Sequence, residues 1–302
     1  MKIRLVLLVY DEGELITDHM SKKAFPEHWN TRISILEQAM QDKSLDLVIT
    51  SNDFFVLTPN CILSPTEYLE KEGLLKEFNQ LPNKIHLITG VDLHNNRIIF
   101  NPYNALNSIV YYLPLKDNSG YKVEKFIWES WIEEGKCNQA AFASQNENRI
   151  IEFKFNDKKI KICLLSCGDI LSVCHVKGKL LPLADIYLGV AHVDFKKWFV
   201  RSKEKNTDRT NIHKWKNDDS LTVIVTQNIT RNKIENKDFF AIDNNKEIYQ
   251  LIWPVDVRNN MTIQKLRLDQ QDYIFIDIVV SNKQTVSSDT VKDLTKNEIE
   301  NS

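Results

Sequence analysis

The feature of this sequence that most constrains its fold is a series of short, continuous apolar runs separated by polar segments. Runs of this kind are typical of strands that are buried on both faces, as in parallel or mixed sheets. The runs are Ile3–Val9, Leu45–Ile49, Ile85–Thr89, Ile109–Leu113, Ile160–Leu165, Ile186–Val190, Leu221–Val225 and Tyr273–Val280. They predict an α/β chain built around mixed sheets.

Helical spacing of apolar residues fills the first gaps between these runs. Thr31–Met40 and Pro65–Gln80 both place apolar side chains on one face of a helix, so the chain is expected to open as β-α-β. Arg97–Asn101 is predicted to be a further strand, and Leu180–Asp185 a short helix. From residue 150 the segments IIEFKF and IKICLLSC predict a hairpin that feeds a buried strand.

Composition and charge exclude several classes of function. The chain has 302 residues, 42% of them hydrophobic and 26% charged, with a formal net charge of −2. Nothing in this balance favours binding to nucleic acid or to an anionic membrane. The first apolar run is interrupted by Arg4 and leads into acidic residues, so it predicts a strand rather than a signal peptide. No run approaches the ~20 apolar residues of a membrane span. We therefore expect a soluble, cytoplasmic protein.

The cysteines indicate reduced thiols. Their number is odd, and they are Cys61, Cys137, Cys163, Cys167 and Cys174. The Cys163-x3-Cys167 spacing has no second Cys/His pair at the distance that a structural zinc site needs. GxGxxG, GxxxxGK[ST] and HExxH motifs are also absent from the sequence. We expect no metal and no cofactor.

Cys167 is the most informative candidate for catalysis. In KICLLSCGDIL it follows directly on the end of a predicted buried strand, and Gly168 permits a tight turn after it. A strand end holds a nucleophile rigidly and leaves backbone N–H groups free to bind an oxyanion. The alternative is that Cys167 is a small buried apolar residue, which is the usual place of a free cysteine.

Several segments follow one another in an order that points to a known family. These segments are LDLVITSNDFF, YKVEKFIWESWIEE, IKICLLSCGDI and SLTVIVTQNITRN. Over residues 1–280 their order and rough spacing resemble the nitrilase superfamily of carbon–nitrogen hydrolases. That family uses a Glu–Lys–Cys triad on a four-layer α-β-β-α sandwich of two mixed sheets. The resemblance implies one domain over 1–280 with a flexible polar tail at 281–302, a small amide-type substrate, and a homodimer.

The resemblance also assigns roles to individual residues. It makes Cys167 the nucleophile, within the Cys-x-Asp pattern that Asp169 completes. Lys125 corresponds to the lysine that stabilises the tetrahedral intermediate, and Lys122 is the alternative because the Tyr-x-Lys pattern is shifted. A lysine ammonium next to a thiol favours the thiolate, which is the reactive form.

The acidic positions are where the chain departs from the family. Glu133 falls near the place of a supporting glutamate, with Glu134 as its alternative. Where the family has Pro-Glu, this chain has Ser51-Asn52-Asp53, which puts Asn52 or, after a shift of one residue, Asp53 at the position of the general base. An asparagine amide takes up no proton at useful pH. An aspartate can act as a base, but its carboxylate is one methylene shorter, and proton transfer needs hydrogen-bond reach.

Two functions are therefore compatible with the sequence. The first is a hydrolase of a non-peptide C–N bond, of the amide or nitrile type, that acts through a cysteine thioester with a divergent general base. The second is a catalytically inactive protein of the same fold that binds a ligand or a partner. The thiol and the lysine favour the first, and the altered base favours the second.

Overall fold

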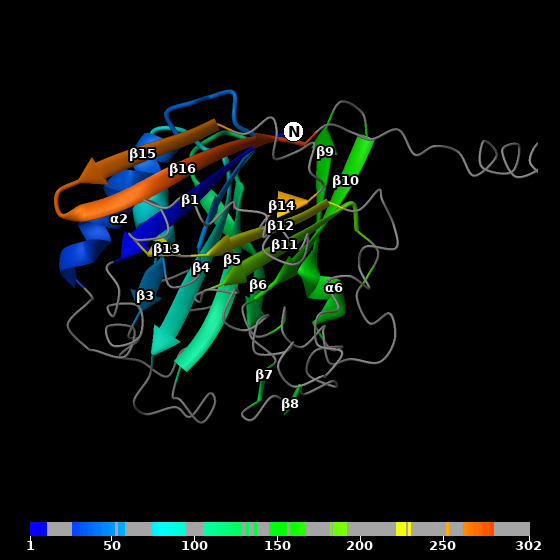
Figure 1. Cartoon of the computed structure of the whole chain (residues 1–302). Helices are drawn as coiled ribbons and strands as arrows, with labels where there is room; N and C mark the ends of the chain where they lie inside the picture. The colour runs from blue at the N-terminus through cyan, green and yellow to red at the C-terminus, as the bar shows by residue number, and fades with distance from the viewer. Residues whose placement is uncertain are drawn as a thin grey trace, which may run out of the picture.

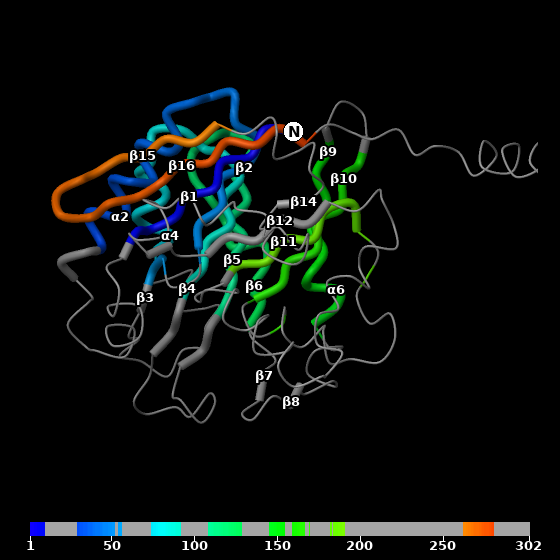
Figure 2. The backbone as a smooth tube through the Cα atoms, viewed as in Figure 1, coloured from blue at the N-terminus to red at the C-terminus, as the bar shows by residue number. Residues whose placement is uncertain are grey.

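The computed structural model of the chain describes residues 1–10, 26–51, 54–57, 74–94, 105–128, 131–132, 136–137, 145–155, 158–166, 169, 182, 184–191, 222–227, 229–230, 252–253 and 262–280. Figure 1 labels the elements along the chain, and Figure 2 traces its backbone.

The larger of two mixed sheets has nine strands. They are β1 (Lys2–Tyr10), β2 (Leu47–Thr50), β3 (Phe55–Leu57), β4 (His86–His94), β5 (Ala105–Pro114), β6 (Tyr121–Trp128), β13 (Ile229–Thr230), β15 (Thr262–Leu268) and β16 (Gln271–Val279). The main order is β15-β16-β1-β2-β4-β5-β6, with β13 paired to β1 and β3 paired to β4. β1, β2 and β4 run parallel to one another, whereas β16, β5 and β6 each join the sheet by antiparallel pairing.

The smaller sheet has five strands in the order β14-β12-β11-β10-β9. They are β9 (Ile150–Phe155), β10 (Lys158–Leu165), β11 (Ile186–Ala191), β12 (Thr222–Gln227) and β14 (Ile252–Trp253). β10, β11 and β12 are parallel, and the two outer strands are antiparallel to their neighbours. A separate two-stranded pair consists of β7 (Trp131–Ile132) and β8 (Lys136–Cys137).

Two hydrophobic clusters show how these layers pack. The first contains residues of both sheets, among them Leu5, Ile49, Ile162 and Leu188, so the sheets share one core. The second lies on the other face of the larger sheet, where α2 (Pro26–Ala39) and α4 (Leu75–Phe78) cover it. Because side chains alternate along a strand, β1, β2, β4, β5 and β16 each supply residues to both clusters. This explains why these five strands contain continuous apolar runs in the sequence.

The coarse prediction of the fold is confirmed, because the chain is an α/β protein with two mixed sheets. Each of the predicted apolar runs contains or overlaps a strand. The helix predicted at Thr31–Met40 is α2, which begins earlier, at Pro26. Of the helix predicted at Pro65–Gln80, only the part from residue 74 is described, and it contains α4. The strand predicted at 97–101 and the tail at 281–302 lie outside the described residues.

The short helix predicted at Leu180–Asp185 is wrong where the structure describes it. Pro182, Ala184 and Asp185 are not helical. Asp185 instead exchanges hydrogen bonds with the backbone of Lys161, donating its own N–H and accepting the Lys161 N–H on its carboxylate. These bonds begin the pairing of β11 with β10.

In the described part of the chain, no helix is long and apolar enough to cross a membrane.

The parallel strands of both sheets, together with β6, end at one edge of the shared core. β6 is antiparallel to β5, which is antiparallel to β4, so β6 ends at the same edge as β2 and β4. β13 follows β12 after a single residue and pairs in parallel with the end of β1, at Val9 and Tyr10. The end of β12, and with it the ends of its parallel neighbours β10 and β11, therefore lies beside the end of β1.

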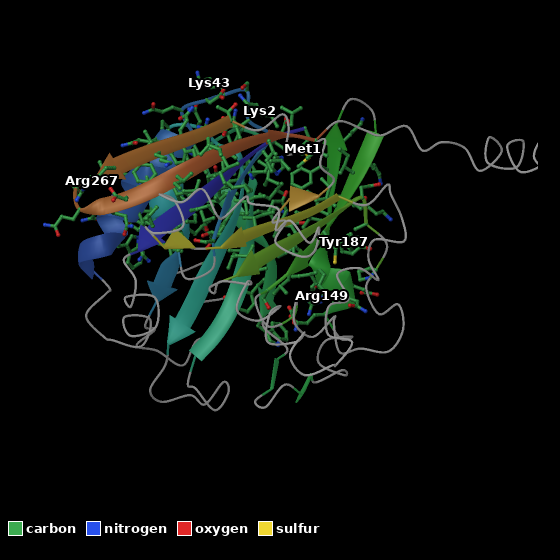
Figure 3. The ribbon with its side chains drawn as sticks, in the orientation of Figure 1. Met1, Lys2, Lys43, Arg149, Tyr187 and Arg267 are labelled. Carbon is green, nitrogen blue, oxygen red and sulfur yellow. The ribbon has the colours of Figure 1, made fainter. Side chains whose placement is uncertain are left out.

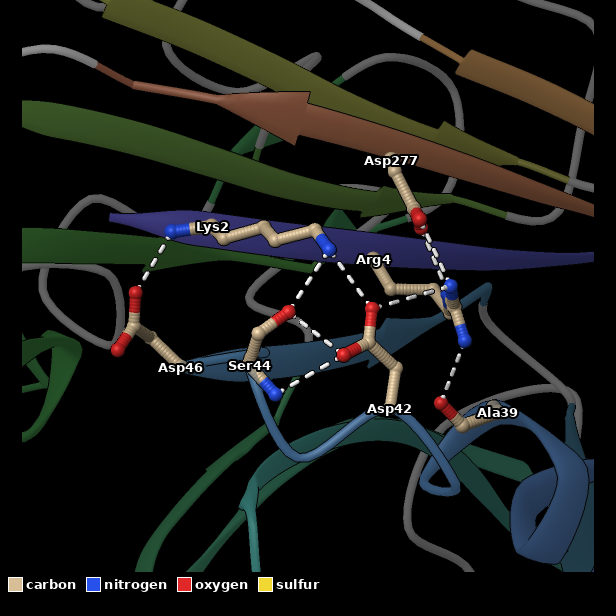
Figure 4. Close-up of polar contacts among 7 residues, drawn as sticks. All are labelled: Lys2, Arg4, Ala39, Asp42, Ser44, Asp46 and Asp277. Atoms are coloured by element: carbon tan, nitrogen blue, oxygen red, sulfur yellow. Dashed lines mark hydrogen bonds and ion pairs between the residues drawn. The ribbon is translucent and has the colours of Figure 1, made fainter.

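Near the start of β1, a buried arginine joins the larger sheet to α2. Arg4 donates to both carboxylate oxygens of Asp277, at 2.6 and 2.7 Å, and to the carbonyl oxygen of Ala39, at 2.8 Å (Figure 4). Ala39 is the last residue of α2, where a cation satisfies a terminal carbonyl and offsets the helix dipole. Nearby, Lys2 pairs with Asp42 at 2.7 Å.

His86 connects the two sheets by aromatic packing. Its Nδ1 lies 2.7 Å from the hydroxyl of Tyr111, and its ring meets the ring of Phe153 of β9 edge to face at 4.7 Å. Burial lowers the pKa of His86 below its ordinary value of 6.5, and Asp46 partly opposes this shift.

The fold should therefore lose stability in mild acid through His86. A folded-state pKa below the unfolded value means that the unfolded chain binds more protons as the pH falls through 6.5, so the stability present above 6.5 is lost below it. Between about pH 7.5 and about pH 5.5, urea unfolding should show a larger loss of stability for the wild type than for His86→Gln. Equal losses in the two proteins would contradict this assignment.

Candidate functional site

Lys125 faces the core between the two sheets. It is the last member of a row of paired residues that crosses the larger sheet, Leu5–Ile49–Ile88–Tyr111–Lys125. The four residues before it all belong to the core shared by the sheets, as does Ile127 two positions later on the same face. Lys125 itself is half-buried. It lies three residues before the end of β6, about 10 Å along the strand.

A β-bulge places the two candidate lysines on the same face of β6. The pairing of β5 with β6 skips Glu124, because Tyr111 pairs with Lys125 whereas Tyr112 pairs with Val123. The extra residue puts Lys122 and Lys125 on the same face although they are three positions apart. Lys122, however, is exposed near the start of β6 and forms an ion pair with Glu124 at 2.6 Å. The geometry thus favours Lys125.

The end of β10 is held by a fully buried polar cluster. Asp169 pairs with Arg149 at 2.7 Å, and both side chains are 0% exposed. The same carboxylate oxygen accepts the Ser166 hydroxyl at 2.7 Å and the Ser166 backbone N–H at 3.2 Å. Arg149 also donates to the carbonyl oxygen of Leu164 at 3.3 Å. Arg149 thus fixes Asp169, and Asp169 fixes Ser166, so the residues on both sides of Cys167 in the sequence are held.

One turn of helix ties this cluster to β6. Gln145 is 1% exposed, and its side chain exchanges two 3.1 Å hydrogen bonds with the backbone of Trp128, the last residue of β6. α6 (Asn146–Arg149) follows at once, and the Arg149 N–H donates to the Gln145 carbonyl oxygen at 3.0 Å. Figure 3 shows Arg149 at α6, near the lower ends of β9 and β10 in this view. The strand of Lys125 and the strand before Cys167 are thus both joined to this helical turn near their ends.

The buried thiol in this region is a poor nucleophile. Cys163 lies within β10, 0% exposed, and burial raises its pKa to about 12, although the charge of Arg149 acts in the opposite direction. A thiol with such a pKa carries almost no thiolate near neutral pH. Cys163 is therefore a core residue, so of the two neighbouring cysteines only Cys167 remains a candidate nucleophile.

The segment of the divergent base is fixed on both sides. Ser51 is buried, and its N–H donates to the carbonyl oxygen of Val6 at 3.3 Å. Phe54 is 0% exposed, and its carbonyl oxygen accepts a 2.6 Å hydrogen bond from Arg32 of α2. This segment follows β2, at the same edge of the larger sheet as the end of β6.

The structure describes part of the predicted site. Lys125, Lys122 and Asp169 are described, and Asp169 forms a buried ion pair. Five predicted residues lie outside the described residues, namely Cys167, Asn52, Asp53, Glu133 and its alternative Glu134. Among the residues that are described, no cluster of His, Cys, Asp and Glu could hold a metal ion.

Sequence reasoning missed Gln145, Arg149 and Ser166. Gln145 and Arg149 stand in the polar stretch QNENR, which has the composition of an ordinary turn. The only sign of the burial of Arg149 was that it directly precedes the apolar run IIEFKF. Most charged residues next to a strand are solvated, so this sign was weak.

The sequence matches no model of a protein family and no curated protein. Function is therefore inferred from the residues and their geometry.

Proposed function

We propose that this chain is a nitrilase-like hydrolase that cleaves a non-peptide C–N bond through a thioester on Cys167. The observation that carries the proposal is the link made by α6 between the ends of β6 and β10. It brings together the strand of a core-facing lysine and the strand that precedes the candidate nucleophile. Two of the three chain segments that the reaction needs thus end at one place, and the third follows β2 at the same edge.

In the proposed reaction the Cys167 thiolate attacks the carbonyl carbon of an amide, and the carbonyl electrons move to oxygen. The Lys125 ammonium stabilises this oxyanion and favours the thiolate beforehand. When the intermediate collapses, the C–N bond breaks and the amine leaves with a proton from the general acid. Water then attacks the thioester and releases the acid and the thiol. Asp53 takes the place of the usual glutamate in both proton transfers, with Asn52 as the alternative occupant of that position.

The proposal extends to the parts of the fold that complete the family's architecture. A second helical layer over the smaller sheet would make the four-layer sandwich, as one domain over residues 1–280. The described layers support this, because helices already cover the outer face of the larger sheet. Small amide-type molecules are the proposed substrates, and a homodimer is the proposed assembly.

Thiol alkylation tests the proposal directly. At about pH 6.5, iodoacetamide should modify Cys167 far faster than the other cysteines, because a neighbouring ammonium lowers its pKa. Lys125→Met should slow this reaction about tenfold, which corresponds to one unit of thiol pKa. Peptide mass spectrometry of the folded protein measures each site separately.

Lys122→Met is the matched control, since it removes an exposed lysine of the same strand. It should leave the rate at Cys167 unchanged. Equally slow modification of all five cysteines would instead support the second function, a non-catalytic binding protein. The replacement of Pro-Glu by Ser51-Asn52-Asp53 is the observation that favours that function.

A further inference from the structure

Trp128 has an unusual hydrogen-bond partner for the end of an edge strand. β6 is the last strand of the larger sheet, so only β5 pairs with it along that sheet. The N–H of Trp128 donates to Oε1 of Gln145, and Nε2 of Gln145 donates to the carbonyl oxygen of Trp128, both at 3.1 Å. The amide of one side chain thus replaces the residue of a neighbouring strand. Both bonds are partly buried, and backbone groups shielded from water require such partners.

The other end of this connection is equally restrained. Gln145 and Arg149 are joined by one helical hydrogen bond, so their separation is fixed by one turn of α6. The guanidinium of Arg149 then contacts Asp169 and the carbonyl oxygen of Leu164, and Asp169 contacts Ser166. Gln145, Arg149, Ser166 and Asp169 are at most 1% exposed. Several hydrogen bonds between buried side chains restrict the alternative arrangements that such a connection can adopt.

We propose that Gln145 is a positioning residue that sets the distance between Lys125 and Cys167. The proposal rests on the function proposed above. Gln145 fixes the end of the lysine strand to one end of α6, and Arg149 at the other end of α6 holds Asp169, which in turn binds Ser166. A change in this connection should alter how strongly the ammonium acts on the thiol, because their interaction depends on distance.

The test is the pH dependence of Cys167 alkylation in four full-length proteins: wild type, Gln145→Ala, Lys125→Met and the double variant. Gln145→Ala should raise the midpoint of the pH profile, with a rate at about pH 6.5 lower by roughly threefold to tenfold. In the Lys125→Met background the same change should have no further effect, because the ammonium is already gone. A purely structural role would not produce this dependence on Lys125.

Asn79→Ala is the control at the other end of the same strand. Its side-chain oxygen accepts the backbone N–H of Tyr121, the first residue of β6, at 2.7 Å. The loss of this bond should leave the profile unchanged. If Gln145→Ala does not fold, as judged by circular dichroism, Ser166→Ala weakens the other end of the connection and should shift the midpoint in the same direction.

The outcomes separate this inference from the proposed function. If Cys167 of the wild type is no more reactive than the other cysteines, the proposed function fails. If it is reactive but the midpoint is unchanged in the folded variant, the role of Gln145 is refuted. A shift of equal size in the presence and absence of Lys125 also refutes it.

Discussion

Replacement of Arg149 by Met should lower the free energy of unfolding by about 3–5 kcal/mol, the usual effect of removing one partner of a buried ion pair. Arg149 and Asp169 are both 0% exposed, so the carboxylate would remain charged in the core without its cation. The Ser166 hydroxyl and N–H would still bond it, but they supply only partial charges. Urea unfolding at neutral pH measures the loss as a lower midpoint at unchanged slope.

Two further variants identify the cause. Arg149→Met combined with Asp169→Leu removes both charges and should recover much of the stability, because an apolar pair of similar volume is often neutral or better. Lys159→Met breaks an exposed ion pair with Glu152, at 3.1 Å, and should leave the stability almost unchanged. A loss in Arg149→Met no greater than that in Lys159→Met would contradict the buried-pair assignment.

The second large effect is expected at Arg4. Arg4→Met removes two hydrogen bonds to Asp277 and one to the end of α2, and should cost roughly 3 kcal/mol. The effect lies at the lower end of the range for buried pairs because the side chain of Asp277 is 14% exposed, so water solvates part of the remaining charge. Thermal unfolding should show a decrease in Tm.

Lys2→Met provides the matched control on the same strand. Its pair with Asp42 is about one third exposed on both sides, and such pairs contribute ~1 kcal/mol or less. The Arg4→Met and Asp277→Leu changes should not add, because they remove the same interaction. Additive losses in the double variant would show that Arg4 acts mainly through its other contacts.

The sequence predicted the strands well because their signal is local. The central strands of the larger sheet, such as β1, are apolar on both faces, so a continuous run such as Ile3–Val9 identifies them without knowledge of their neighbours. β4 and β5 extend beyond the apolar runs Ile85–Thr89 and Ile109–Leu113, and these extensions were not predictable. Asp92 of β4 and Asn107 of β5 have low strand propensity and are strand residues because they pair with each other.

The site was harder to predict because its organisation depends on contacts between distant segments. The bulge at Glu124, which brings both lysines onto one face, has no signature in the sequence and follows from the pairing with β5. The burial of Arg149 depends on Asp169, twenty residues later. The apolar strand that leads to Ser166 was thus predictable, whereas the connection between the strand ends was not.

The central place of β1 in the larger sheet affects how this protein can fold during synthesis. One neighbour of β1 is β2, which follows closely in the chain, and the other is β16, near residue 279. In the pairing of β1 with β16, Lys2 lies opposite Val279 and Val9 lies opposite Asp272. Until residue 279 has left the ribosome, β1 lacks its partner β16, so the backbone N–H and C=O groups on that side of β1 have no strand to pair with. Such long-range pairing gives a high contact order, slows folding, and exposes apolar edges to aggregation. Chaperones that shield strand edges should therefore raise the yield of the folded protein.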